Sequence, residues 1–183
     1  MREEWLGLGL RVLAQEGEPG IRIDRLAERL GRSKGSFHHH FRGAADYKRA
    51  LLERYEQLAV GDLDEAIDAL GDASPQVVFA ALTARMSSAP DSLWDPELEI
   101  AVRSWSFADP EARATQERVD RARYDRMLTQ WRRLTDDDDR ARTAARLPFL
   151  VAVGASVALP TPTPDELRAV YAMLSEFLGV AAE

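Results

Sequence analysis

The chain contains no cysteine, which excludes disulfides, zinc–thiolate sites and cysteine nucleophiles. No uncharged apolar run approaches the roughly 18 to 20 residues that span a bilayer, and the longest, residues 147–159, is too short. The first residues carry acids and no apolar segment before a cleavage site, so we expect no signal peptide. These absences predict a cytoplasmic protein with no membrane partner.

The residues that catalysis needs are also scarce. The only three histidines, His38, His39 and His40, are consecutive. Consecutive residues of a helix point about 100° apart, so the three imidazoles cannot easily converge on one metal ion. The sequence has no glycine-rich phosphate loop and no serine elbow. We therefore expect no metal site, no cofactor and no enzymatic activity.

Charge is divided unevenly along the chain. The net charge of −7 argues against a nucleic-acid partner. However, residues 1–55 hold 11 Lys and Arg against 8 Asp and Glu, whereas the remainder holds 13 against 23. This asymmetry is typical of a basic binding head attached to an acidic body.

Apolar residues recur at helical spacing almost throughout, as in Leu98, Ala101, Val102 and Trp105. A Ser, Asp or Thr directly before a proline favours a helix start, and we expect helices to begin at Ser74-Pro75, Asp95-Pro96, Asp109-Pro110 and Thr163-Pro164. The pattern predicts an all-α fold of about nine helices. We expect them near residues 2–16, 22–30, 33–40, 44–70, 75–88, 96–107, 110–134, 138–158 and 164–181. Pro148, inside the eighth, predicts a kink or a split there.

Residues 21–55 predict two short helices joined by a tight turn at Gly31, the plan of a helix-turn-helix. At 100° per residue, Phe37 and Phe41 share one side of the second helix and Gly35, Ser36 and His39 the other. That narrow polar face suits the major groove. Cations near it in sequence are candidate phosphate contacts: Arg22, Arg25, Arg32, Arg42, Lys48 and Arg49. A helical hairpin with a solvated face explains the same pattern equally well.

The run Gly31-Arg32-Ser33-Lys34-Gly35-Ser36-Phe37-His38-His39-His40-Phe41 resembles the recognition-helix signature of TetR-type repressors. The resemblance covers about residues 5–55 and implies that the second short helix enters the major groove. The DNA-binding residues it implies, together with the nearby cations, are Arg22, Arg32, Ser33, Lys34, Gly35, Ser36, His38, His39, His40 and Lys48.

Three positions depart from the family pattern. His38 replaces the tyrosine that usually contacts phosphate, and Ala44 stands where a basic residue is common. Lys48, one turn later, is a candidate to compensate for Ala44. Ile21-Arg22 stands in place of the usual Ser or Thr cap of the preceding helix.

The resemblance also implies two domains and a dimer. We expect a DNA-binding domain at 1–46 and a helical regulatory and dimerisation domain at 47–183. Two helices from each chain would form a four-helix bundle. The predicted dimer residues are Leu147, Leu150, Val151, Gly154, Val157, Leu167, Val170, Tyr171, Leu174, Phe177 and Leu178. The alternative is that these apolar stripes pack only within one subunit.

Large side chains of the middle helices are candidates for an effector pocket, although an ordinary core is an equally good interpretation. They are Met86, Trp94, Trp105, Phe107, Tyr124, Met127 and Trp131. Few charges lie among them, so we expect an apolar or aromatic effector. The sequence thus predicts a dimeric repressor that binds palindromic operator DNA and is released by a small molecule. The alternative is a helical dimeric adaptor that does not bind DNA.

Overall fold

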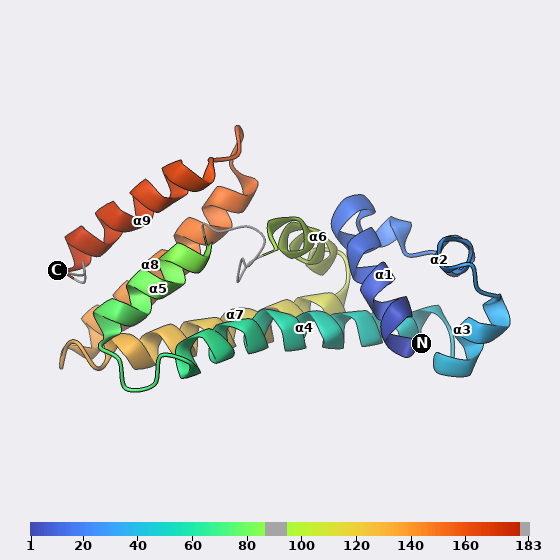
Figure 1. The fold of residues 1–183 in the computed structure, drawn as a ribbon, viewed down its shortest axis with the longest axis horizontal. Coiled ribbons are helices and arrows are strands. Elements are labelled where there is room, and N and C mark those ends of the chain that lie inside the picture. Colours follow the sequence, from blue (N-terminus) through green and yellow to red (C-terminus); the bar gives the residue numbers. More distant parts are fainter. Residues whose placement is uncertain (87–94, 180–183) are drawn as a thin grey trace. The chain divides into compact units, whose positions relative to one another are not determined.

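The computed structural model describes residues 1–86 and 95–179, and helices are the only regular secondary structure in that part of the chain (Figure 1). This confirms the predicted all-α fold. The helices are α1 Arg2–Glu16, the short 3-10 helix η1 Glu18–Gly20, α2 Ile23–Leu30, α3 Lys34–His40, α4 Ala44–Asp68, α5 Pro75–Met86, α6 Pro96–Ser106, α7 Pro110–Trp131, α8 Asp138–Val157 and α9 Pro164–Leu178.

Side-chain caps determine where several helices begin, as the sequence predicted. Asp95 accepts a hydrogen bond from the backbone N–H of Leu98 at 3.0 Å at the start of α6. Thr163 and Glu166 form a capping box at the start of α9. Asp137, from the run of four aspartates, accepts from the N–H of Arg140 at 3.0 Å and begins α8. Each cap satisfies an N–H group that has no partner within its own helix.

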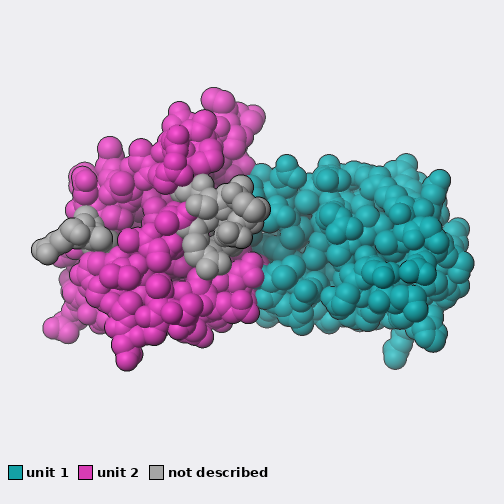
Figure 2. All heavy atoms as spheres, viewed as in Figure 1, with its two compact units in different colours: residues 1–58, 95–119 teal, residues 59–94, 120–183 magenta. Residues whose placement is uncertain are grey.

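The chain divides into two compact units (Figure 2). Unit 1 comprises residues 1–58 and 95–119, and unit 2 comprises residues 59–94 and 120–183. The helices α4 and α7 each contribute residues to both units. This division describes how the helices pack and does not test where the DNA-binding domain ends. The boundary expected between the DNA-binding and regulatory domains, at residues 46 and 47, therefore stays a prediction.

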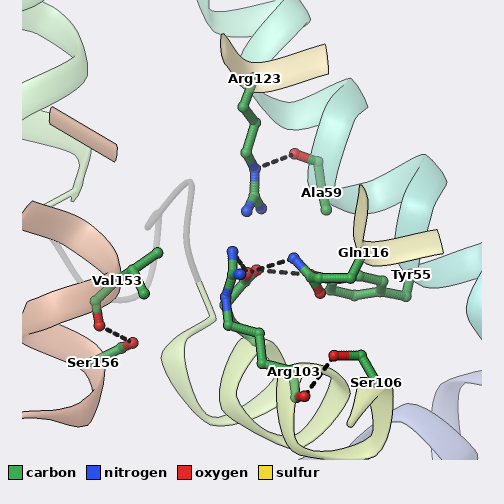
Figure 3. Close-up of polar contacts among 9 residues, drawn as sticks. Tyr55, Ala59, Arg103, Ser106, Gln116, Arg123, Val153 and Ser156 are labelled. Atoms are coloured by element: carbon green, nitrogen blue, oxygen red, sulfur yellow. Dashed lines mark hydrogen bonds and ion pairs between the residues drawn. The ribbon is translucent and has the colours of Figure 1, made fainter. Parts of the chain in front are cut away.

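Unit 1 holds α1, η1, α2, α3 and α6 together with parts of α4 and α7. Within it α1 packs against α6 and α2, and α2 packs against α3. A buried carboxylate, Glu99, joins three of its helices. Glu99 accepts hydrogen bonds from the hydroxyl of Tyr55 at 2.7 Å and from Nε2 of Gln116 at 3.0 Å, and it pairs with Arg103 at 2.7 Å (Figure 3). These partners offset the cost of burying the charge.

Unit 2 has its own apolar core, drawn from the ends of α4 and α7 and from α5 and α8. The core comprises Ala66, Ile67, Val78, Phe79, Leu82, Met127, Leu128, Trp131, Ala141, Ala144 and Ala145. The helix α9 packs against α5 and α8. The sequence predicted a kink or a split of this helix at Pro148. The helix α8 continues through that residue, so it is not split there. The hydroxyl of Tyr171 on α9 donates to the carbonyl oxygen of Pro148 at 2.9 Å.

Candidate nucleic-acid interface and ligand cavity

The turn between α2 and α3 has the geometry that the sequence predicted for a helix-turn-helix. Gly31 adopts φ 61° and ψ 34°, a left-handed conformation that favours glycine. The N–H of Arg32 closes the turn by donating to the carbonyl oxygen of Ala27 at 2.9 Å. Ser33 Oγ then accepts from the N–H of Ser36 at 3.2 Å and begins α3. Arg22 precedes α2 without a side-chain capping bond, as its residue type predicts.

The inner face of α3 is held by an aromatic cluster. Phe37 is 0% exposed and Phe41 is 2% exposed, which confirms that both point inward. The Phe37 ring centroid lies 5.3 Å from that of Trp5 on α1 and 5.3 Å from that of Tyr47 on α4. The Tyr47 hydroxyl donates to the backbone oxygen of Trp5 at 2.5 Å, and burial raises the pKa of this phenol. The cluster therefore fixes the orientation of α3 relative to α1 and α4.

A close approach between α1 and α4, which the sequence analysis missed, depends on Gly9. A Cβ atom at Gly9 would lie 2.7 Å from Cδ2 of Leu51 and would overlap the Tyr47 hydroxyl. Only a residue without a side chain permits this contact. The sequence contained an indication of this contact, namely a glycine in the middle of an amphipathic helix. Glycine lowers helix stability there, so its presence suggests that a side chain would not fit.

The outer face of α3 carries the predicted polar groups. Lys34, Gly35, His38 and His39 are exposed, and Ser36 is half-buried. A Cβ atom at Gly35 would meet only Ser33 Oγ, at 3.5 Å, so the space beside this glycine is open. The structure thus brings small groups and hydrogen-bonding groups to one side of α3, which a surface can approach closely. Two other predicted residues, Ser33 and His40, lie at the start and end of the helix and are exposed and half-buried respectively.

Within the described residues, all the predicted cations outside α3 except Arg42 are engaged in ion pairs. Arg22 pairs with Asp24 at 3.3 Å, and Arg32 pairs with Glu4 at 3.5 Å. Lys48 is half-buried and pairs with Glu18 of η1. The Lys48 ammonium also lies 5.9 Å from the ring centroid of Trp105. In this conformation Lys48 is therefore bound within unit 1, and a phosphate contact by it would require the pair with Glu18 to open.

Unit 2 contains an apolar cavity of about 90 Å³. Its lining comprises Ala59, Leu63, Phe79, Leu82, Thr83, Arg123, Met127, Trp131, Pro148, Phe149, Ala152, Tyr171, Leu174, Ser175 and Leu178. Three of its polar groups already bond to backbone oxygens: Thr83 Oγ1 to Phe79 at 2.8 Å, Tyr171 Oη to Pro148 at 2.9 Å, and Arg123 Nε to Ala59 at 3.3 Å. The walls therefore favour an apolar occupant.

This lining includes Met127 and Trp131 from the predicted pocket set. Tyr124 lies beside the unit 2 core, with the Arg146 guanidinium 4.6 Å from its ring centroid, and does not line the cavity. Trp105 and Phe107 belong to unit 1, where Trp105 is buried and Phe107 is 82% exposed. Trp94 and the Met86 side chain lie outside the described residues. The sequence analysis did not identify the residues of α5, α8 and α9 that line the cavity. Helical spacing shows which residues share an apolar face, but it does not show which of these faces surround a cavity.

The predicted dimer residues separate into outward and inward groups. The outward group is exposed and consists of Leu150, Gly154, Val157, Val170 and Phe177. The inward group consists of Tyr171, which is buried, and of Leu174 and Leu178, which line the cavity with it. The remaining residues, Leu147, Val151 and Leu167, are half-buried. The exposed group, which includes a phenylalanine that is 88% exposed, leaves α8 and α9 with an apolar surface.

None of the described helices is both long enough and apolar enough to cross a membrane. No family model matches the chain. A segment of 58 residues is 36% identical to the transcriptional regulator AcuR from Cereibacter sphaeroides. That segment makes up 32% of this chain and 26% of AcuR.

Solved structures match over nearly the whole chain. A protein from Saccharomonospora viridis, described as a transcriptional regulator and crystallised with choline, matches with a TM-score of 0.77 and 21% identity over 96% of this chain and 95% of its own. A TetR-family transcriptional regulator from Streptomyces coelicolor matches with a TM-score of 0.76 and 20% identity over 97% and 93%. At such identities the likeness establishes the fold. The chain has the fold of TetR-family regulators.

Proposed function

We propose that this chain, as a protein with the TetR-family fold, regulates transcription by binding double-stranded operator DNA through α3. The observation that carries the proposal is the two-sided character of α3. Phe37 and Phe41 anchor one side in the aromatic cluster, and the other side presents Gly35 and His39 to solvent. Lys34 is exposed at the start of the helix. A slim helix of this kind fits the major groove, where side-chain donors meet base edges and phosphates.

Repression requires two such helices on one operator, so we propose a homodimer. The exposed apolar residues of α8 and α9, among them Leu150, Val170 and Phe177, support this part of the proposal. Exposed apolar patches commonly mark protein interfaces. A two-fold dimer would present its two α3 helices to major grooves about 34–36 Å apart on a palindromic operator.

We further propose that a small apolar effector binds in the unit 2 cavity and releases the DNA. The cavity volume of about 90 Å³ is smaller than the ~150 Å³ cavity that holds benzene in another protein. An aromatic effector must therefore widen the cavity by moving a wall. The choline complex of the Saccharomonospora viridis protein is a precedent for a small molecule bound to this fold.

The decisive experiment is binding of the purified chain to labelled DNA from upstream of its own gene. Fluorescence anisotropy should show specific binding that weakens as salt rises, because bound phosphates release counterions. Footprinting should then show two protected half-sites. Lys34→Gln should weaken binding to specific and scrambled duplexes alike, since a phosphate contact carries no sequence information.

Failure to bind any duplex at low ionic strength would overturn the DNA-binding proposal. A stable homodimer without DNA binding would then favour the adaptor. Circular dichroism of the same preparation confirms that a negative result comes from folded protein.

A further inference from the structure

The Lys and Arg residues of the N-terminal segment, residues 1–58, differ in whether they form an ion pair with a carboxylate. Residues 1–58 contain eleven Lys and Arg, all within the described residues. Seven form ion pairs with carboxylates: Arg22, Arg25, Arg29, Arg32, Lys48, Arg49 and Arg54. In this described segment the other four form no ion pair, and they are Arg2, Arg11, Lys34 and Arg42. A cation without an ion pair can bind a phosphate directly. A paired cation must first break its ion pair, which leaves an unpaired carboxylate close to the phosphate.

Three of these four cations lie at the two ends of α3. Lys34 is the first residue of α3, and Arg42 follows Phe41, the C-cap residue of that helix. Arg2 comes from α1, but the fold places its guanidinium carbon 5.3 Å from the ring centroid of Phe41. Arg2 and Arg42 are both exposed. Arg2 is more than thirty residues from α3 in sequence, so only the tertiary structure reveals its position.

We propose that Arg2 is a phosphate-binding residue of the DNA interface and that, with Arg42, it holds the backbone at the C-terminal end of α3. This inference rests on the proposed DNA-binding function. A helix of seven residues is about 10 Å long at 1.5 Å per residue. The major groove is about 12 Å wide. Cations at both ends of α3 therefore reach the phosphate rows on both sides of a groove that α3 enters.

Neighbouring contacts leave the Arg2 guanidinium without a carboxylate partner in this segment and place it beside the Phe41 ring. The two acids in the same turn of α1 are already used, since Glu3 pairs with Arg54 at 3.7 Å and Glu4 pairs with Arg32 at 3.5 Å. The Arg2 guanidinium carbon lies over the Phe41 ring, and the N–H groups of the guanidinium form no ion pair within this described segment. By contrast, a phosphate contact by Arg32 would leave the Glu4 carboxylate near the DNA without its partner.

The test compares Arg2→Gln with Arg11→Gln. Both changes remove one unpaired cation from α1, so they alter the net charge equally. The second position is nine residues further along α1 than the first, which places the two about 180° apart around the helix. The measurement is the salt dependence of anisotropy for a labelled duplex from upstream of the gene. Each lost phosphate contact lowers the slope of log K against log salt by about 0.9, or about 1.8 for a dimer.

We expect this loss of slope for Arg2→Gln and an unchanged slope for Arg11→Gln. Arg2→Lys should retain most of the slope but bind more weakly than the wild type, because lysine keeps the charge without the planar group. Circular dichroism and thermal unfolding should be the same for all variants. Equal slopes for Arg2→Gln and the wild type would overturn the inference, as would equal losses for both glutamine variants. If the wild-type chain ignores every duplex, the proposed function itself fails.

Discussion

Replacing Gly9 with alanine should destabilise unit 1, although alanine is the better helix former. The new Cβ atom would lie 2.7 Å from Leu51 Cδ2 and would overlap the Tyr47 hydroxyl, so α1 must move away from α4. That movement strains the bond from Tyr47 to the backbone oxygen of Trp5. The aromatic cluster that orients α3 includes both of these residues, so we also expect weaker DNA binding.

The magnitude follows from three effects. Overpacking a close contact costs about 1–3 kcal/mol. Loss of the Tyr47 hydrogen bond adds about 0.5–1.5 kcal/mol. Alanine in place of glycine within a helix returns about 1 kcal/mol. We therefore expect Gly9→Ala to lower the free energy of unfolding by about 1–3 kcal/mol, which corresponds to a fall in Tm of several degrees for a chain of this size.

Gly35→Ala is the matched control, because it makes the same chemical change in a helix with open space beside it. Its Cβ would meet only Ser33 Oγ, at 3.5 Å. We expect equal or higher stability, by up to about 1 kcal/mol. Its DNA affinity should nevertheless fall on the order of tenfold, or about 1.4 kcal/mol, because the methyl group lies on the face that we propose enters the groove.

Urea unfolding followed by circular dichroism measures the stability of both variants. Hydrogen exchange shows where the change occurs, and for Gly9→Ala the faster exchange should be confined to unit 1 amides. A Gly9→Ala protein as stable as the wild type would refute the close approach of α1 and α4. A Gly35→Ala protein with unchanged DNA affinity would refute the contact face assigned to α3.

Three further outcomes are expected. Phe177→Glu should convert the proposed dimer to a monomer in sedimentation analysis, because it puts a charge on the exposed apolar surface of α9. Ala114→Glu, at an exposed position of α7, should leave the dimer intact. A dimeric Phe177→Glu protein would exclude the α9 surface as the dimer interface. Indole should bind in the cavity and raise the Tm of the wild type, and Ala152→Leu, which fills part of the cavity, should abolish this rise. An equal rise in the variant would place indole elsewhere. Burial raises the pKa of Tyr47 and Tyr171 above their ordinary value of 10.0, so the stability they confer is fully present below pH 10 and is lost as the pH rises further. Phenolate absorbance that appears for both residues well before unfolding would contradict their burial.

Helix positions were predictable because their signals are local. A cap such as Asp137 or Thr163 and the proline after Thr163 act on the backbone within one turn. The inward direction of Phe37 and Phe41 was predictable for the same reason, since the helical repeat alone places them on one side of α3. The turn at Gly31 likewise needs only its own residues and their neighbours. The candidate recognition face could therefore be identified before any tertiary contact was known.

Contacts between distant segments were not predictable in this way. The sequence shows that Lys48 is a cation on the fourth helix, but only the fold brings it to Glu18. Tyr171 belongs to an apolar stripe, yet tertiary packing turns it inward while Phe177 of the same stripe faces solvent. Gly9 and Arg2 acquire their roles from Leu51 and Phe41, more than thirty residues away. Periodicity determines which residues share a helix face, whereas the neighbour that covers that face depends on how the helices pack against one another.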